Sequence, residues 1–205
     1  SVQQGLFAGI AMVIARIIAH WGPTPIAAQK VGSQIESISW MTSGGFSTAI
    51  SAFVGQNFGA GKFDRIKKGY RKGLEIVGVI GVFATVLLMF GASPVFKLFI
   101  PDDPEALEIG IRYLRILALS QFFMAIEIAS QGAFNGLGKT IPPSLVGVTF
   151  NALRIPASLV LSSTFLGLDG VWWSISISSV FKGIILTTWY ILVLRKIKVQ
   201  DSEIV

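Results

Sequence analysis

Four charged side chains lie deep inside apolar runs of this sequence: Glu36, Glu127, Arg154 and Lys182. A charge in a membrane-spanning helix costs several kcal/mol unless it faces other protein or a water-filled cavity. Each of the four is therefore a candidate functional group. The two carboxylates are the groups suited to take up and release a cation or a proton.

Glu36 belongs to a polar stripe with helical spacing. Residues three or four positions apart share one face of a helix. The members of this face are Gln29, Ser33, Glu36, Trp40, Ser43, Ser47 and Ser51. We expect the face to be wet or packed against protein, not exposed to lipid. Close packing through small residues is the alternative for the serines, and a purely structural ion pair is the alternative for Glu36.

Glu127 belongs to a second stripe, which consists of Ser120, Glu127, Gln131 and Asn135 at intervals of seven, four and four. Glu127 could exchange a proton, and together with the two amide oxygens it could help to hold Na⁺. The alternative is a salt bridge from Glu127 to Arg154 or Lys182, and both states fit different conformations of one protein. In the next helix Asn151 and Arg154 share a polar face beside Pro156.

The composition places these groups in a membrane protein. Hydrophobic residues make up 52% of the 205 positions and charged residues only 14%, and the mean hydropathy is +0.68. A soluble domain carries about 25% charged residues. The chain has no Cys and a single His, His20. This excludes disulfides, Cys/His zinc sites and His-based triads, so we expect no enzyme, no metal centre and no cofactor beyond a coupling ion.

The apolar runs predict an all-α, polytopic membrane protein with six transmembrane helices, because about 20 apolar residues span a bilayer. The expected helices cover about 5–19, 26–54, 74–93, 107–135, 141–164 and 168–194. They form one transmembrane unit over 1–198, followed by a tail over 199–205. Because the number of spans is even, both termini are expected on the same side of the membrane.

Basic residues predict which side that is. One set of connections, together with the tail, carries ten: Lys62, Arg65, Lys67, Lys68, Arg71, Lys72, Lys139, Arg195, Lys196 and Lys198. The opposite loops carry only Lys97. By the positive-inside rule both termini face the cytoplasm across the inner membrane. This pattern accounts for the basic charge without a nucleic-acid partner. The pairs Trp172-Trp173 and Trp189-Tyr190 are expected to anchor the last helix at the two interfaces.

Several motifs resemble the multidrug and toxic compound extrusion (MATE) family. They are 27–35, Gly44-Gly45-Phe46-Ser47-Thr48-Ala49, 54–62 with its Gly-Gln-x-x-Gly-Ala segment, 132–143 and 151–156. The resemblance implies the C-terminal six-helix lobe of a twelve-helix transporter, with Ser1 marking a cut and an N-terminal six-helix lobe as the missing partner. Helix one differs from many relatives because it carries Arg16 and no acid.

By resemblance, the protein is a secondary antiporter that exports small organic, often cationic, compounds in exchange for H⁺ or Na⁺. Glu127 would be the coupling carboxylate of this lobe, and substrate would bind between helices one, two, four and five. Two alternatives stay open. One is a flippase of the same superfamily for lipid-linked saccharides, with Arg16, Lys30, Arg154 and Lys182 as head-group ligands. The other is a non-transporting membrane scaffold, in which the buried charges pair with one another.

Overall fold

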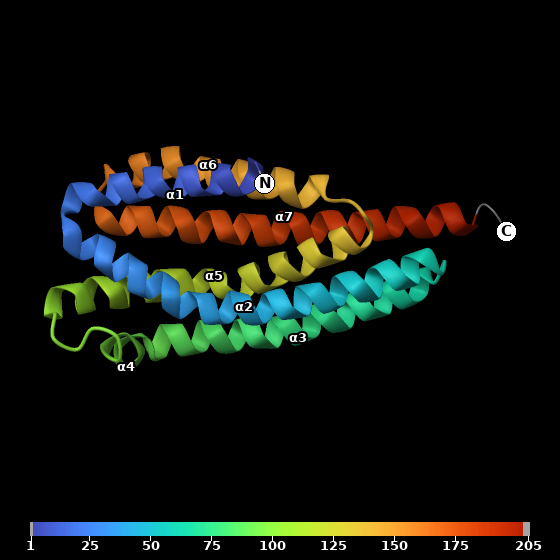
Figure 1. Cartoon of the computed structure of the whole chain (residues 1–205), viewed down its shortest axis with the longest axis horizontal. Helices are drawn as coiled ribbons and strands as arrows, with labels where there is room; N and C mark the ends of the chain where they lie inside the picture. The colour runs from blue at the N-terminus through green and yellow to red at the C-terminus, as the bar shows by residue number, and fades with distance from the viewer. Residues whose placement is uncertain (1, 203–205) are drawn as a thin grey trace.

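A computed structural model describes residues 2–202 and shows an all-α bundle of long rods that run back and forth along one axis (Figure 1). The helices are α1 (Val2–Ile18), η1 (Ala19–Trp21), α2 (Pro23–Gly59), α3 (Phe63–Phe90), α4 (Ala92–Lys97), α5 (Pro104–Gly136), α6 (Ile141–Ser162) and α7 (Leu168–Ser202). Six of these are long and correspond to the six predicted spans. The additional elements are η1, a turn of 3-10 helix, and α4, a short helix at one end of the bundle.

Proline and glycine set the helix ends. Pro23 and Pro104 each stand in the first turn of a helix, where a missing backbone N–H leaves no hydrogen bond broken. Before Pro104, the carboxylate of Asp103 accepts a hydrogen bond from the backbone N–H of Ala106 at 3.0 Å. The turn between α5 and α6 contains Gly138 at φ 71°, a left-handed conformation that glycine adopts without steric cost.

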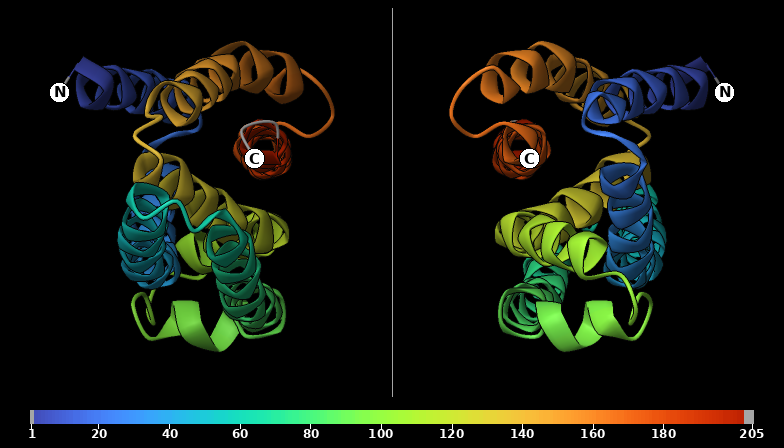
Figure 2. Two further views of the ribbon diagram at one scale, coloured as in Figure 1. Left: turned by 90° about the vertical axis from the view of Figure 1, so that its right-hand side faces the viewer. Right: turned by 90° about the vertical axis from the view of Figure 1, so that its left-hand side faces the viewer.

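Helix α5 is the centre of the bundle, since it packs against α2, α3 and α7. In the end-on views α1 and α6 form a separate layer, and α7 lies between that layer and the α2, α3 and α5 group (Figure 2). Helix α2 approaches α5 closely at Gly132, where an added Cβ would meet the backbone oxygen of Ser47. The Ser47 hydroxyl donates to the Ile128 carbonyl at 2.7 Å. Small residues at this interface let the two backbones meet.

Several helices continue past their apolar runs. Helix α3 begins at Phe63, not near 74, and α7 continues to Ser202, not to about 194. Residues 199–202 of the predicted tail are therefore helical, and 203–205 lie outside the described residues. The physical reason is that an apolar run reports the thickness of the hydrocarbon layer, whereas Lys and Arg are good helix formers that extend the helix into water.

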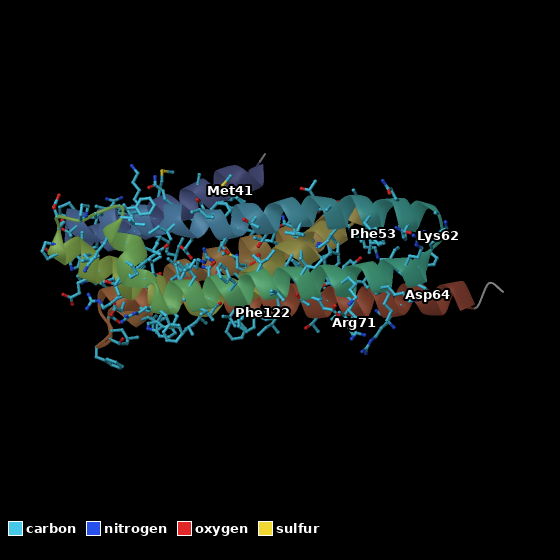
Figure 3. All side chains as sticks on the ribbon, turned by 90° about the horizontal axis from the view of Figure 1, so that it is seen from below. Met41, Phe53, Lys62, Asp64, Arg71 and Phe122 are labelled. Carbon is cyan, nitrogen blue, oxygen red and sulfur yellow. The ribbon has the colours of Figure 1, made fainter. Side chains whose placement is uncertain are left out.

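Four helices of the described chain are long and apolar enough to cross a membrane: α3, α5, α6 and α7 up to Ile197. The apolar segment Gly5–Trp21 is shorter. Helix α2 is long but rich in Ser, Gly and Gln and is not in this set. Figure 3 shows Phe53 between α2 and α3, whereas Arg71 points away from the bundle.

Each of the two aromatic pairs expected to anchor α7 at the membrane interfaces contains one residue that is buried inside the bundle. Trp172 and Tyr190 are fully buried. The Trp172 ring packs edge-on against Tyr113, with ring centroids 4.9 Å apart, and Tyr190 packs between Tyr70 and Phe134. The anchor prediction was wrong for these two residues, because adjacent residues on a helix point in different directions and packing turned these two inward.

Candidate functional site

Glu36 is buried at the interface of α2 with α5, and only 8% of the residue is exposed. Tyr113 donates a hydrogen bond to Oε2 of Glu36 at 2.7 Å, and the amide of Gln121 donates to Oε1 at 2.7 Å. Both donors come from α5. The carboxylate therefore faces protein, and each of its oxygens has a partner that compensates for lost water.

A polar contact connects this buried carboxylate to the other side of α2. The Tyr113 hydroxyl lies 3.4 Å from the Ser33 hydroxyl, and Ser33 lines a cavity of about 490 Å³. Glu36 therefore contacts Tyr113, Tyr113 contacts Ser33, and Ser33 lines the cavity. Glu36 itself is not among the residues that line the cavity.

Glu127 forms an ion pair with Lys182, which connects α5 to α7. The Nζ–Oε1 distance is 3.3 Å, and the side chains are 10% exposed for Lys182 and 14% for Glu127. Of the two salt-bridge partners that the sequence left open, the structure shows Lys182. Like Glu36, Glu127 faces other helices and not lipid.

The remainder of the Glu127 stripe does not join it. Gln131 and Asn135 are exposed at the surface of α5, although they follow Glu127 at helical spacing. Among residues 5–197, whose side chains the structure describes, no group of three or more His, Cys, Asp or Glu side chains could hold a metal ion. The Na⁺ site at Glu127 stays a prediction.

Arg154 is held by two serines of α7. Its Nε donates to the Ser178 hydroxyl at 2.6 Å, and its Nη2 donates to the Ser179 hydroxyl at 2.9 Å. Both partners are neutral, so these bonds orient the guanidinium without cancelling its charge. Asn151, one turn earlier on α6, has a buried Oδ1 without a hydrogen-bond partner among the described residues.

Three of the predicted site residues line the cavity together: Gln29 from α2, and Asn151 and Arg154 from α6. Lys30 and Ser33 complete the polar part of the lining. The apolar part comes mostly from α1, and α7 adds Ile175. The predicted helix four, now α5, contributes no lining residue in the described chain, because α7 occupies the place expected for it.

The family model MatE matches residues 1–160. The chain belongs to the MatE family. One similar protein is the probable multidrug resistance protein NorM of Thermotoga maritima, 29% identical over 174 residues, which are 84% of this chain and 37% of that protein. Another is the FAD transporter of Shewanella oneidensis, 26% identical over 172 residues, 84% of this chain and 38% of that protein.

Solved MATE structures share the fold. A MATE transporter in the bent conformation superposes with a TM-score of 0.90 at 17% identity, and the match covers 98% of this chain and 44% of that chain. This MatE chain is thus a helical membrane protein that spans less than half the length of the relatives it matches. One of these relatives is named as a multidrug resistance protein and the other as a transporter, and neither name is that of an enzyme.

The sequence did not single out several partners that organise the site in this MatE chain. Tyr113 and Gln121, which bind Glu36, were missed, as were Ser178 and Ser179, which bind Arg154. The signal for the serines was available, because four serines fall within 174–179 of an otherwise apolar helix. Tyr113 carried no such signal, since a tyrosine in an apolar run is commonly a core residue.

Proposed function

We propose that this chain is the C-terminal six-helix lobe of a secondary multidrug antiporter. With an N-terminal six-helix lobe it would export small organic compounds across the inner membrane in exchange for H⁺ or Na⁺. Family membership and relatives named for multidrug resistance support the export of such compounds. The observation that carries the antiport proposal is that two carboxylates, Glu36 and Glu127, face the inside of a membrane bundle, and that Glu36 is connected to the cavity through Tyr113 and Ser33.

Ion coupling would act through the Glu127–Lys182 pair. When H⁺ or Na⁺ neutralises Glu127, Lys182 loses its partner, and a buried unpaired ammonium favours a rearrangement of α7 against α5. A conformation that binds the ion better is then more populated when the ion is bound. Alternating exposure of a cavity driven in this way is the mechanism of secondary transporters.

The proposal is tested by dye efflux from cells that express this chain with its N-terminal lobe. Glu127→Gln is expected to abolish efflux driven by an H⁺ or Na⁺ gradient. The control is Glu108→Gln, which changes an exposed carboxylate of the same helix. Because Glu127→Gln leaves Lys182 unpaired, the double variant E127Q/K182Q is measured as well. Undiminished gradient-driven efflux in both Glu127 variants would end the coupling proposal.

We also propose that both termini face the cytoplasm. Support comes from the outward face of α3, where residues at intervals of three and four change from basic to apolar. The members of this face are Arg65, Lys68, Lys72, Ile76, Val79, Phe83, Val86 and Phe90. All of them are exposed, as expected for a helix that passes from head groups into hydrocarbon.

The orientation is tested with single-cysteine variants, for which the Cys-free sequence is already suited. A membrane-impermeant thiol reagent added outside intact cells is expected to label Lys97→Cys and not Lys67→Cys. Labelling of Lys67→Cys alone would reverse the orientation.

The second candidate is transport of anionic molecules, including lipid-linked diphosphates. It is favoured by the two cationic residues in the cavity lining, Lys30 and Arg154, and by a relative named as a transporter of FAD, which is an anionic dinucleotide. The scaffold alternative is less favoured, because a scaffold has no need of a cavity with unpaired polar groups. Thermal stabilisation by cationic dyes or by lipid diphosphates separates the two transport functions.

A further inference from the structure

The charged residues that line the cavity between α1, α2 and α6 are all positive. Among its described residues, Lys30 and Arg154 carry positive charge and no Asp or Glu is present. We propose that this cavity binds the acidic group, a carboxylate or a phosphate, of an organic molecule. The proposal rests on the proposed function only in treating the cavity as a substrate site, and it names the class of substrate.

The neighbouring carboxylates do not line the cavity, and each has its own partner within hydrogen-bond or ion-pair distance. Glu36 accepts from Tyr113 and Gln121 on the α5 side of α2. Glu127 is paired with Lys182. Arg154 donates to two serine hydroxyls, which fix the plane of the guanidinium, and it forms no ion pair within 4 Å in the described chain, although Glu127 and Glu36 attract it at longer range. A positioned guanidinium is the group best suited to bind carboxylate or phosphate.

The remaining lining indicates what carries the acidic group. Phe7, Ile10, Ile14 and Ile26 form an apolar wall, and a volume of about 490 Å³ lies in the usual range for pockets that bind small organic molecules. Asn151 adds a side-chain amide to the lining, a group that can hydrogen-bond a polar substituent of a ligand. The expected ligand is an aromatic or prenyl body with an acidic end.

An organic cation does not satisfy this lining. Its charge would be brought close to Lys30 and Arg154 in a partly dehydrated space, and like charges there destabilise the complex. This lobe alone would therefore select against the cationic compounds that the family resemblance suggested.

The test is equilibrium binding to this chain assembled with its N-terminal lobe in phosphatidylcholine nanodiscs, without an ion gradient. Fluorescein and rhodamine 123 share a xanthene body and differ in charge, and their fluorescence anisotropy reports binding. Farnesyl diphosphate, measured by competition, supplies the lipid-like source of the acidic group. Because no gradient is used, failed antiport and failed anion binding are separate results.

We expect fluorescein or farnesyl diphosphate to bind at least about tenfold more tightly than rhodamine 123, a difference of about 1.4 kcal/mol. Arg154→Gln should weaken anion binding about tenfold, and Lys30→Gln about threefold, because the exposed ammonium is screened by water. Arg16→Gln is the matched control, since Arg16 is exposed and outside the lining.

Preference for fluorescein assigns the site to soluble organic anions, and preference for farnesyl diphosphate assigns it to a lipid diphosphate. Tighter binding of rhodamine 123 overturns the proposal, and so do equal affinities for the two dyes. The proposal is also overturned if the single variants Lys30→Gln and Arg154→Gln both bind the anions as tightly as the unchanged chain does. Lys30→Gln changes an exposed residue, so it keeps the test decisive even if Arg154→Gln does not fold.

Discussion

Removing either member of the Glu127–Lys182 pair should destabilise the bundle more than removing both. The Nζ–Oε1 distance of 3.3 Å gives a Coulomb attraction of about 5 kcal/mol at an effective dielectric constant of about 20. Both side chains are at most 14% exposed, so water compensates little when one is left alone. A buried charge that loses its partner costs about 3–5 kcal/mol.

We therefore expect Glu127→Gln and Lys182→Gln each to lower the free energy of unfolding by about 3 kcal/mol. The double variant should lose less than the sum, because it leaves no buried charge without a partner. The expected coupling free energy is about 1–3 kcal/mol. It is measured as a double-mutant cycle of unfolding in mixed detergent micelles, followed by circular dichroism.

The control cycle uses the exposed pair of Glu108 and Arg112 on α5, whose atoms are 3.7 Å apart and whose side chains are 75% and 46% exposed. Its coupling should stay below about 1 kcal/mol, because surface pairs are screened. An additive result for Glu127 and Lys182, with both single variants folded, would refute the assignment of a buried ion pair and the coupling step built on it.

Two further substitutions test the interface of α2 with α5. Tyr113→Phe removes the hydrogen bond to Glu36 and should cost about 1.5–3 kcal/mol of unfolding free energy. The control is Tyr190→Phe, which should cost nothing because the Tyr190 hydroxyl is buried without a partner in the described chain. Equal losses of stability in the two variants would contradict the role of the hydrogen bond to Glu36. Gly132→Ala places a Cβ against the Ser47 backbone and should cost about 1–3 kcal/mol. Gly44→Ala, with open space around it, should be neutral or stabilising by up to about 1 kcal/mol, and thermal unfolding that ranks the two glycine variants the other way would show that α2 and α5 are not closely packed.

The six long helices could be predicted from the sequence, because hydrocarbon thickness fixes the length of an apolar run and proline or glycine marks its ends. The same reasoning placed the start of α3 too late in the sequence and the end of α7 too early. Lys and Arg at these positions favour helix as well as water contact, so polarity alone did not mark the end of the helix.

The candidate site was predictable only in part. Helical period put Gln29 near Ser33 and Asn151 near Arg154, and the structure brings both pairs to one cavity. The same period grouped Gln131 with Glu127, yet Gln131 is exposed. A stripe on one helix states which residues share a face but not how wide the buried part of that face is.

The amino-acid sequence by itself determined that this chain is a bundle of membrane helices with the four charged residues deep in its apolar runs turned inward, because hydrocarbon penalises an exposed charge. Only the tertiary structure decided which partner each buried charged side chain contacts. Glu127 pairs with Lys182 of α7 and not with Arg154, and Glu36 is bound by Tyr113 and Gln121. These choices depend on the rotation and height of each helix against its neighbours, which close packing at residues such as Gly132 sets and which no single helix encodes.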